Sequence, residues 1–255
     1  MNHLVYTELK EKETYLFGSK LHLLTMHQTV ELIIKAIKAH LRLTHCVINV
    51  AKLVQMQKDG ALAQAVNACD IVNVDGMGLV WGGRCLKIAI PERVTGIDLM
   101  QNLFTRAQDE KMRIFFLGAT PEVLVKMVKK VQEQWPRLIL AGQQDGYFRA
   151  ADEISVVKKI QASSADMLFI AISSPKKELF IAQYASELTV PFIMGVGGSF
   201  DVLAGQVRRA PRWMQMSGLE WLYRLGQEPR RMWKRYLVTN SLFVWMLIKE
   251  KWCSR

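Results

Sequence analysis

The sequence has little of what would build a metal or redox site. Its four cysteines, Cys46, Cys69, Cys85 and Cys253, form no C-x-x-C pair, and no histidine stands near them at zinc-finger spacing. This pattern argues against a bound metal ion and against a catalytic disulfide. It predicts buried free thiols in a reducing cytosol.

Long apolar runs are also missing. No continuous apolar segment follows the first charged residues, and the apolar stretch 237–248 is interrupted by Thr239, Asn240 and Ser241. Neither a signal peptide nor a transmembrane span is therefore expected. We expect the protein to be made and kept in the cytoplasm.

Three nucleotide-binding or metal-binding motifs are absent or incomplete. There is no G-x-x-x-x-G-K-[ST] loop, which excludes P-loop NTPase chemistry, and Gly195, Gly197 and Gly198 lack the third glycine of a G-x-G-x-x-G loop. There is also no D-x-D triplet, with which many nucleotide-sugar transferases hold a divalent metal. Any phosphate group would therefore have to be met by helix N-termini, backbone N–H groups and Arg or Lys side chains.

Acidic residues are scarce at the end of the chain. The 255 residues carry a net charge of +11. Residues 207–255 hold eleven Lys or Arg against three Glu, a net charge of +8, and five of the seven tryptophans. Such a charge predicts an anionic partner, which is phosphate, nucleotide, nucleic acid or lipid headgroup.

The rest of the chain alternates strand and helix patterns. Apolar runs typical of strands occur at 46–50, 71–74, 113–117, 138–141, 167–172 and 192–196. Helical patterns occur at 29–43, from 53 toward 68, from 120 and at 154–161. We therefore expect an α/β fold, a mainly parallel Rossmann-like sheet with helices on both faces.

The domain organisation follows from the same patterns. Residues 1–206 are expected to form the α/β core, because half of the chain is hydrophobic and supplies one sizeable core. Residues 207–255 are expected to form a basic, Trp-rich helical appendage. The first twenty residues predict only a polar lead-in with one short strand at 15–17.

Polar side chains follow the predicted strands. Asp75 follows the strand at 71–74, and Asn49 lies near the end of the strand at 46–50. In open α/β sheets ligands collect beyond the carboxyl ends of strands, so both residues are candidates for a site. The alternatives stay open: Asp75 and Gly76 form a plain turn, and Asn49 only caps the next helix.

Two further polar clusters have similar alternatives. Arg93, Thr95 and Asp98 belong to a loop-like stretch that opens a helix, and they would serve a site or form a cap and a surface salt bridge. Lys176 and Lys177 follow Ser174-Pro175 in a first helical turn. They would bind phosphate or simply be solvated.

Seven ordered segments make the sequence resemble the WecG/TagA/CpsF family of bacterial glycosyltransferases, from about residue 17 to residue 236. The segments are VDGMG (74–78), RVTG (93–96), FFLG (115–118), DGYF (145–148), SSPKKE (173–178), GVGGSFDVLAG (195–205) and RAPRWMQMSGLEWLYRLGQEPRR (209–231). The order of so many segments is more specific than any one motif.

The resemblance implies an activity and partners. The expected reaction is inverting, metal-independent transfer of a hexose or N-acetylhexosamine-type sugar, without a cofactor, from a UDP-sugar to a polyprenyl-diphosphate-linked acceptor. Such a reaction belongs to synthesis of a surface polysaccharide of exopolysaccharide, teichoic acid or enterobacterial-antigen type. The protein would lie on the inner face of the cell membrane and contact it through residues 207–255. No nucleic acid is expected as a partner, and a homo-oligomer is left open.

The resemblance also implies roles for catalytic residues. Asp75 matches the catalytic base, Asn49 the polar residue of a T-x-N element, and Arg93 an arginine near the diphosphate. A carboxylate suits the base, because an inverting transfer requires removal of the acceptor hydroxyl proton.

The remaining roles concern substrate binding. The residues that the resemblance assigns to the donor or to a diphosphate are Tyr147, Asp201, Arg224 and Arg231, and it implies that residues 207–255 complete the active site. Gly197 and Lys177 are further candidates for substrate binding, with Lys177 reaching the donor diphosphate or a uronic acid carboxylate. Two positions depart from the family pattern, Val47 in place of Thr and Lys177 in place of Gln. Both changes alter the polarity of the donor site, so the donor sugar is not inferred from the family.

The C-terminal segment supports a rival hypothesis, a non-catalytic basic protein that binds membrane or nucleic acid through Trp and Arg side chains. The polar residues at the strand ends favour an enzyme. Within this segment we expect residues 219–225 to pack on the core and residues 230–252 to lie at a membrane interface.

Overall fold

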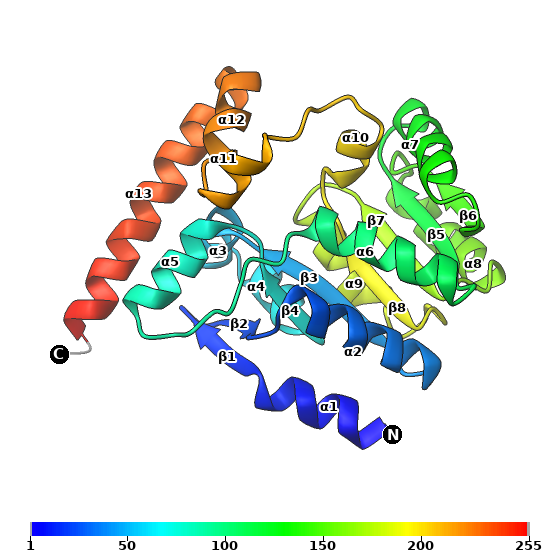
Figure 1. The fold of residues 1–255 in the computed structure, drawn as a ribbon, viewed down its shortest axis with the longest axis horizontal. Helices are drawn as coiled ribbons and strands as arrows, with labels where there is room; N and C mark the ends of the chain where they lie inside the picture. Colours follow the sequence, from blue (N-terminus) through cyan, green and yellow to red (C-terminus); the bar gives the residue numbers. More distant parts are fainter. Residues whose placement is uncertain (1, 254–255) are drawn as a thin grey trace.

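A six-stranded sheet forms the centre of the protein (Figure 1). The computed structural model describes residues 2–253, except for the side chains of residues 2, 3, 231 and 253. The strand order is β4-β3-β8-β7-β5-β6, and all neighbouring pairs are parallel. The strands are β3 (Leu43–Ile48), β4 (Ile71–Val74), β5 (Arg113–Gly118), β6 (Ile139–Gln144), β7 (Met167–Ala171) and β8 (Phe192–Gly195). The predicted Rossmann-like α/β class is confirmed.

Helices cover both faces of this sheet (Figure 1). They are α2 (Met26–Lys38), α3 (Val50–Met56), α4 (Gly60–Asn67), α5 (Met77–Cys85), α6 (Gly96–Asp109), α7 (Pro121–Gln134), α8 (Glu153–Ala162), α9 (Lys176–Tyr184) and α10 (Ser199–Leu203), with a 3-10 turn η1 (Ala150–Asp152) before α8. The predicted helix at 29–43 ends earlier, because β3 already begins at Leu43. The helix predicted from 53 toward 68 is interrupted, because Asp59 caps a new helix by accepting from the Leu62 N–H.

Alternating side chains of the central strands explain the two layers of helices. Phe116 and Phe169 face the layer with α2, α6 and α7, while Phe115 and Leu168 face α8 and α9. Phe104 of α6 meets Phe169 edge to face, with the ring centroids 5.3 Å apart. Burial of each such side chain contributes about 1.5–3 kcal/mol to the stability of the fold. A slip of one residue would turn every side chain of a strand to the other face, so the two buried faces fix the strand register.

The N-terminus differs from the expected polar lead-in. Residues 2–11 form helix α1 (Asn2–Glu11), whose Val5 and Leu9 are buried one turn apart. An antiparallel hairpin follows, β1 (Glu13–Leu16) and β2 (Ser19–His22). The short strand is thus present, but the expectation for the preceding residues is wrong, since two apolar positions at helical spacing suffice to dock a helix.

The C-terminal segment forms α11 (Arg212–Met216), α12 (Glu220–Gln227) and α13 (Pro229–Cys253). The long helix α13 runs along one side of the molecule, with α11 and α12 near its beginning (Figure 1). Phe243 of α13 is buried in the cluster of apolar side chains around α3 and α5. The expected packing of residues 219–225 on the core is wrong, because Trp221 and Leu222 are 39% and 45% exposed. The domain boundary at 206/207 stays a prediction.

The cysteines only partly match the expectation of buried thiols. Cys46 and Cys69 are free and buried, whereas Cys85 is free and exposed. Cys85 lies at the end of α5, beyond the residues that this helix buries. The side chain of Cys253 is outside the described part of the structure.

Candidate functional site

Asn49 and Asp75 lie side by side at the carboxyl ends of β3 and β4. Ile48 pairs with Val74 in the sheet, and the Asp75 N–H donates to the Ile48 carbonyl at 2.7 Å. Gly76 continues the chain at a φ of 139°, a conformation that favours glycine. A Cβ atom built on Gly76 would lie 3.7 Å from Asn49 Cβ. The two residues therefore line the same end of the sheet.

Asn49 has a structural role that is visible in the geometry. Its side-chain oxygen accepts from the Lys52 N–H at 3.0 Å and caps α3. The prediction of a cap residue is confirmed. A role of Asn49 in binding stays a prediction.

Asp75 is partly buried between its strand and the N-terminus of α5. Burial raises the pKa of its carboxyl to about 6, and the negative charge of Glu220 acts in the same direction. The cations Arg93, Arg224 and Lys52 oppose this shift of the pKa. A carboxyl with a pKa near the working pH is suited to general base catalysis.

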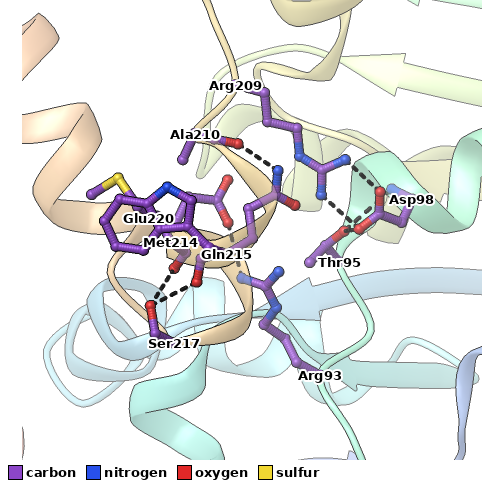
Figure 2. Close-up of polar contacts among 10 residues, drawn as sticks. Arg93, Thr95, Asp98, Arg209, Ala210, Met214, Gln215, Ser217 and Glu220 are labelled. Atoms are coloured by element: carbon purple, nitrogen blue, oxygen red, sulfur yellow. Dashed lines mark hydrogen bonds and ion pairs between the residues drawn. The ribbon is translucent and has the colours of Figure 1, made fainter.

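Arg93 lies next to this carboxylate in the loop between α5 and α6. The following residue, Val94, donates its N–H to the Val74 carbonyl at 2.9 Å, which ties the loop to the end of β4. Arg93 Nη1 lies 2.9 Å from Glu220 Oε2, and the Arg93 side chain is only 13% exposed (Figure 2). The structure thus places the cation Arg93 beside Asp75, and Glu220 of α12 forms an ion pair with Arg93.

A second ion pair joins the start of α6 to the C-terminal segment. Thr95 accepts from the Asp98 N–H as a helix cap and donates to Asp98 Oδ2 at 2.6 Å. Arg209 binds both oxygens of Asp98 at 2.5 and 2.6 Å (Figure 2). Burial acts to raise the pKa of Asp98, but the hydrogen bonds from Arg209 and Thr95 lower it overall. The expected cap and salt bridge are both present, although the salt bridge is partly buried.

Sequence reasoning missed Glu220 and Arg209 as members of this site. Both lie within the segment 209–231 that carries the family resemblance, but nothing in the sequence indicates their partners. Arg224 of α12 is exposed and acts on the pKa of Asp75, so the structure brings it to the same end of the sheet. The side chain of Arg231 lies outside the described residues.

A buried charge cluster lies beside β3 and β8. Lys52 Nζ is 2.8 Å from Glu178 Oε1, and Lys177 Nζ is 3.2 Å from the same oxygen. Burial acts to raise the pKa of Glu178, but Lys52 and Lys177 lower it to about 2. The solvated interpretation of Lys177 is therefore wrong, whereas Lys176 is exposed, with Nζ 4.9 Å from the centroid of the Phe148 ring.

The remaining predicted residues lie on loops after other strands. Gly197 has a φ of +55°, and a Cβ atom there would be 3.8 Å from Lys177 Nζ. Asp201 stands in the first turn of α10. Tyr147 follows the edge strand β6, opposite the edge strand that precedes Asp75, and is 77% exposed. The structure groups Lys177 with Gly197 and places Tyr147 apart from Asp75.

The described residues contain neither a membrane-spanning helix nor a cluster of metal-binding side chains. No helix within residues 2–253 is long and apolar enough to cross a membrane. In the same part of the chain there is no group of three or more His, Cys, Asp or Glu side chains that could hold a metal ion.

Comparison with known proteins gives concordant matches. The model of the glycosyl transferase WecG/TagA/CpsF family matches residues 14–255. A Bacillus spizizenii N-acetylglucosaminyldiphosphoundecaprenol N-acetyl-beta-D-mannosaminyltransferase is 37% identical over 172 residues, which are 68% of this chain and 66% of that protein. A Bacillus subtilis protein of the same description is 36% identical over 194 residues, 76% of this chain and 75% of that protein.

Proposed function

Because the chain belongs to the WecG/TagA/CpsF family of glycosyl transferases, we propose that it transfers a sugar to a polyprenyl-diphosphate-linked acceptor. The donor is a UDP-sugar that carries a hexose or an N-acetylhexosamine-type sugar, and the transfer inverts the anomeric carbon. The acceptor class follows from the two relatives, whose descriptions name a diphosphoundecaprenol substrate.

The observation that carries this proposal is Asp75 beside Arg93 at the carboxyl end of the sheet. Asp75 takes the proton from the acceptor hydroxyl while the hydroxyl oxygen attacks the anomeric carbon. The attack comes from the side opposite the leaving UDP. Its pKa of about 6 leaves it ionised near neutral pH but still able to hold a proton. Arg93 and Arg224 offset the negative charge that develops on the leaving diphosphate.

We propose that this transfer needs no metal ion. The sequence lacks a D-x-D triplet, and arginines from two elements supply positive charge around Asp75. Transfer measured in the presence of EDTA should therefore equal transfer without it. Loss of activity with EDTA and its recovery with Mg²⁺ or Mn²⁺ would contradict this part of the proposal.

We propose that the donor nucleotide binds at the loops after β7 and β8. Gly197 and the buried Lys177 lie together there, and Asp201 follows in the first turn of α10. We propose that Asp201 accepts hydrogen bonds from ribose hydroxyls and that Tyr147 and Arg231 contact the donor or a diphosphate. Asn49 is proposed to orient a substrate next to Asp75.

The location of the enzyme follows from its acceptor. We propose that the protein lies on the inner face of the cell membrane and contacts lipid through residues 207–255. The rival function, a basic binding protein without catalysis, shares this contact but has no use for Asp75.

Release of UDP tests the proposal. A panel of UDP-sugars is incubated with a polyprenyl-diphosphate-linked N-acetylhexosamine, and UDP and glycolipid are measured together. One donor should give both products in equal amounts, and Asp75→Asn should give almost none. Membrane binding without turnover of any donor would favour the rival function.

A further inference from the structure

Glu220 is a partly buried acidic residue that the proposed mechanism does not use. It is the first residue of α12, and its carboxylate is 25% exposed. Its Oε2 accepts from Arg93 Nη1 at 2.9 Å, as Figure 2 shows. Exposed surface ion pairs usually contribute little to stability. In this pair the Arg93 side chain is 13% exposed and the Glu220 side chain 25%, so both are largely withdrawn from solvent.

The position of Glu220 is fixed by the turn that precedes it. Gly218 has a φ of +73°, and a Cβ atom there would lie 2.8 Å from Met77 Cβ and 2.8 Å from Trp81 Cη2. Met77 and Trp81 belong to α5, the helix that begins two residues after Asp75. The turn therefore contacts α5 through its backbone, which leaves Glu220 little freedom to move away from the site.

The charges that face Asp75 come from four parts of the chain. They are Lys52 at α3, Arg93 in the loop before α6, and Glu220 and Arg224 at α12, with Arg209 close enough for its own pKa to respond to Asp75. Glu220 supplies the like charge of this group. All the others are cations, so Glu220 acts together with burial, which is the larger effect, against their stabilisation of the ionised form of Asp75.

We infer that Glu220 is a positioning residue of this site, which orients Arg93 through their ion pair and balances the positive charge around Asp75. The inference rests on the proposed role of Asp75 as the base. It also means that the C-terminal helices complete the site with an acid, in addition to any arginine that contacts substrate. Without Glu220, Arg93 would be free to act on Asp75, and Asp75 would be a weaker base.

The ionisation of Asp75 tests this directly. Carboxyl ¹³C NMR of protein labelled at aspartate, assigned with Asp75→Asn, gives the titration midpoint of Asp75 without any substrate. In Glu220→Gln the midpoint should fall by about one pH unit, because a like charge is removed and Arg93 is released. Glu133→Gln, which removes an exposed carboxylate from α7, is the matched control and should leave the midpoint unchanged.

Activity provides the second measurement. The acid limb of the pH profile of kcat/KM should move in the same direction and by the same amount in Glu220→Gln. A purely structural Glu220 would change stability but neither midpoint. If Glu220→Gln does not fold, Glu220→Ala, which also removes the charge, should give the same shift, whereas Glu220→Asp, which keeps the charge, should stay closer to the wild-type midpoint.

The outcomes separate this inference from the proposed function. An unshifted Asp75 midpoint in folded Glu220→Gln, or in Glu220→Ala where only that variant folds, overturns the role of Glu220. Absence of transfer by the wild-type protein with every donor would contradict the proposed function instead. The NMR titration does not depend on turnover, so the two failures are distinguishable.

Discussion

Asp75, the proposed base, shows at the scale of one residue how a buried charge and a stable fold make opposite demands. Its pKa is raised from 3.8 to about 6, so the folded protein binds a proton more tightly than the unfolded chain does. Stability from this group therefore decreases as pH rises from about 4 to about 6, and the full cost is present above pH 6. The charged carboxylate is kept in spite of this cost.

Asp75→Asn should therefore separate stability from activity. The uncharged amide removes the cost of a partly buried charge, so the free energy of unfolding at pH 7.5 should rise by about 1–3 kcal/mol. Transfer should fall by about 10²- to 10⁴-fold, because the base is lost. Urea denaturation and initial rates on the same sample test both. Near-normal turnover would remove Asp75 from the mechanism.

Two buried histidines give the fold a different dependence on pH. Burial lowers the pKa of His22 and of His45 to about 4, where His22 accepts the Val72 N–H and His45 pairs with Asn73. The unfolded chain binds protons below its pKa of about 6.5, before the folded protein does. Each histidine therefore lowers stability as pH falls from about 6.5 to about 4.

His22→Gln should reduce this acid sensitivity. The difference in unfolding free energy between pH 7 and pH 4.5 should be smaller in the variant than in the wild type, as measured by urea denaturation. His27→Gln, which changes an exposed histidine at the start of α2, should leave the difference as it is. Equal pH dependence in His22→Gln and wild type would contradict the assignment.

At the scale of elements, the buried cluster of Lys52, Lys177 and Glu178 links α3 to α9. One carboxylate holds two ammonium groups, so the cluster keeps one excess positive charge inside the protein. Removing the acid would leave two buried cations without a counter-ion. The depressed pKa of Glu178, about 2, means that acid removes its contribution only as pH falls from about 4.5 toward 2.

Glu178→Gln should accordingly destabilise the protein by about 3–5 kcal/mol at neutral pH. The measurement is chemical denaturation, with Glu187→Gln as a matched loss of an exposed carboxylate beyond the end of α9. A cost below about 1 kcal/mol, the range of exposed ion pairs, would show that the cluster does not stabilise the contact of α3 with α9.

Elements were predicted well where burial alone decides them. All six sheet strands were expected from their apolar runs, because inner parallel strands are buried on both faces, although the edge strand β6 is only half-buried. Helix α1 was missed because, among residues 4–11, the apolar side chains that it buries are only Val5 and Leu9. The two apolar residues of 219–225 stay exposed, because α12 contacts α13 and α11 more than the sheet.

The candidate site was predictable only in part, because some of its residues follow local patterns and others pair over long sequence distances. Asn49, Asp75 and Arg93 follow or flank a strand end, so topology brings them together. Glu220 and Arg209 meet their partners Arg93 and Asp98 across more than 100 residues of sequence. A local pattern contains no information about such a pairing, and the fold of the C-terminal segment decides it.

At the scale of the whole molecule, α13 presents two different faces. Met232 and Phe243 are buried, while large apolar side chains on other faces of the helix are exposed. The exposed ones are Trp233, Leu237, Val238, Val244, Trp245, Ile248 and Trp252. With Arg230, Lys234 and Arg235 beside them, they make a surface suited to anionic lipid.

Substitution on this outer surface should weaken membrane binding without unfolding the protein. Leu237→Ser with Trp245→Ser should reduce sedimentation with anionic liposomes several-fold and leave UDP binding intact, and wild-type binding should weaken as salt rises. Val125→Ser, which changes an exposed apolar residue of α7, is the control. Unchanged sedimentation of the double variant would place the lipid contact elsewhere.

The strand order has a consequence for how the chain is made. β3 pairs with β4 on one side and with β8 on the other, yet β8 is synthesised only after β5, β6 and β7. During translation one edge of β3 therefore stays unpaired until β8 is made. Unpaired strand edges can form hydrogen bonds with other chains and promote aggregation. The sheet closes in a late, non-local step, which slows folding. The ion pairs of Arg93 with Glu220 and of Asp98 with Arg209 can form only after that, so a ribosome-bound chain that ends before β8 holds Asp75 without the assembled candidate site.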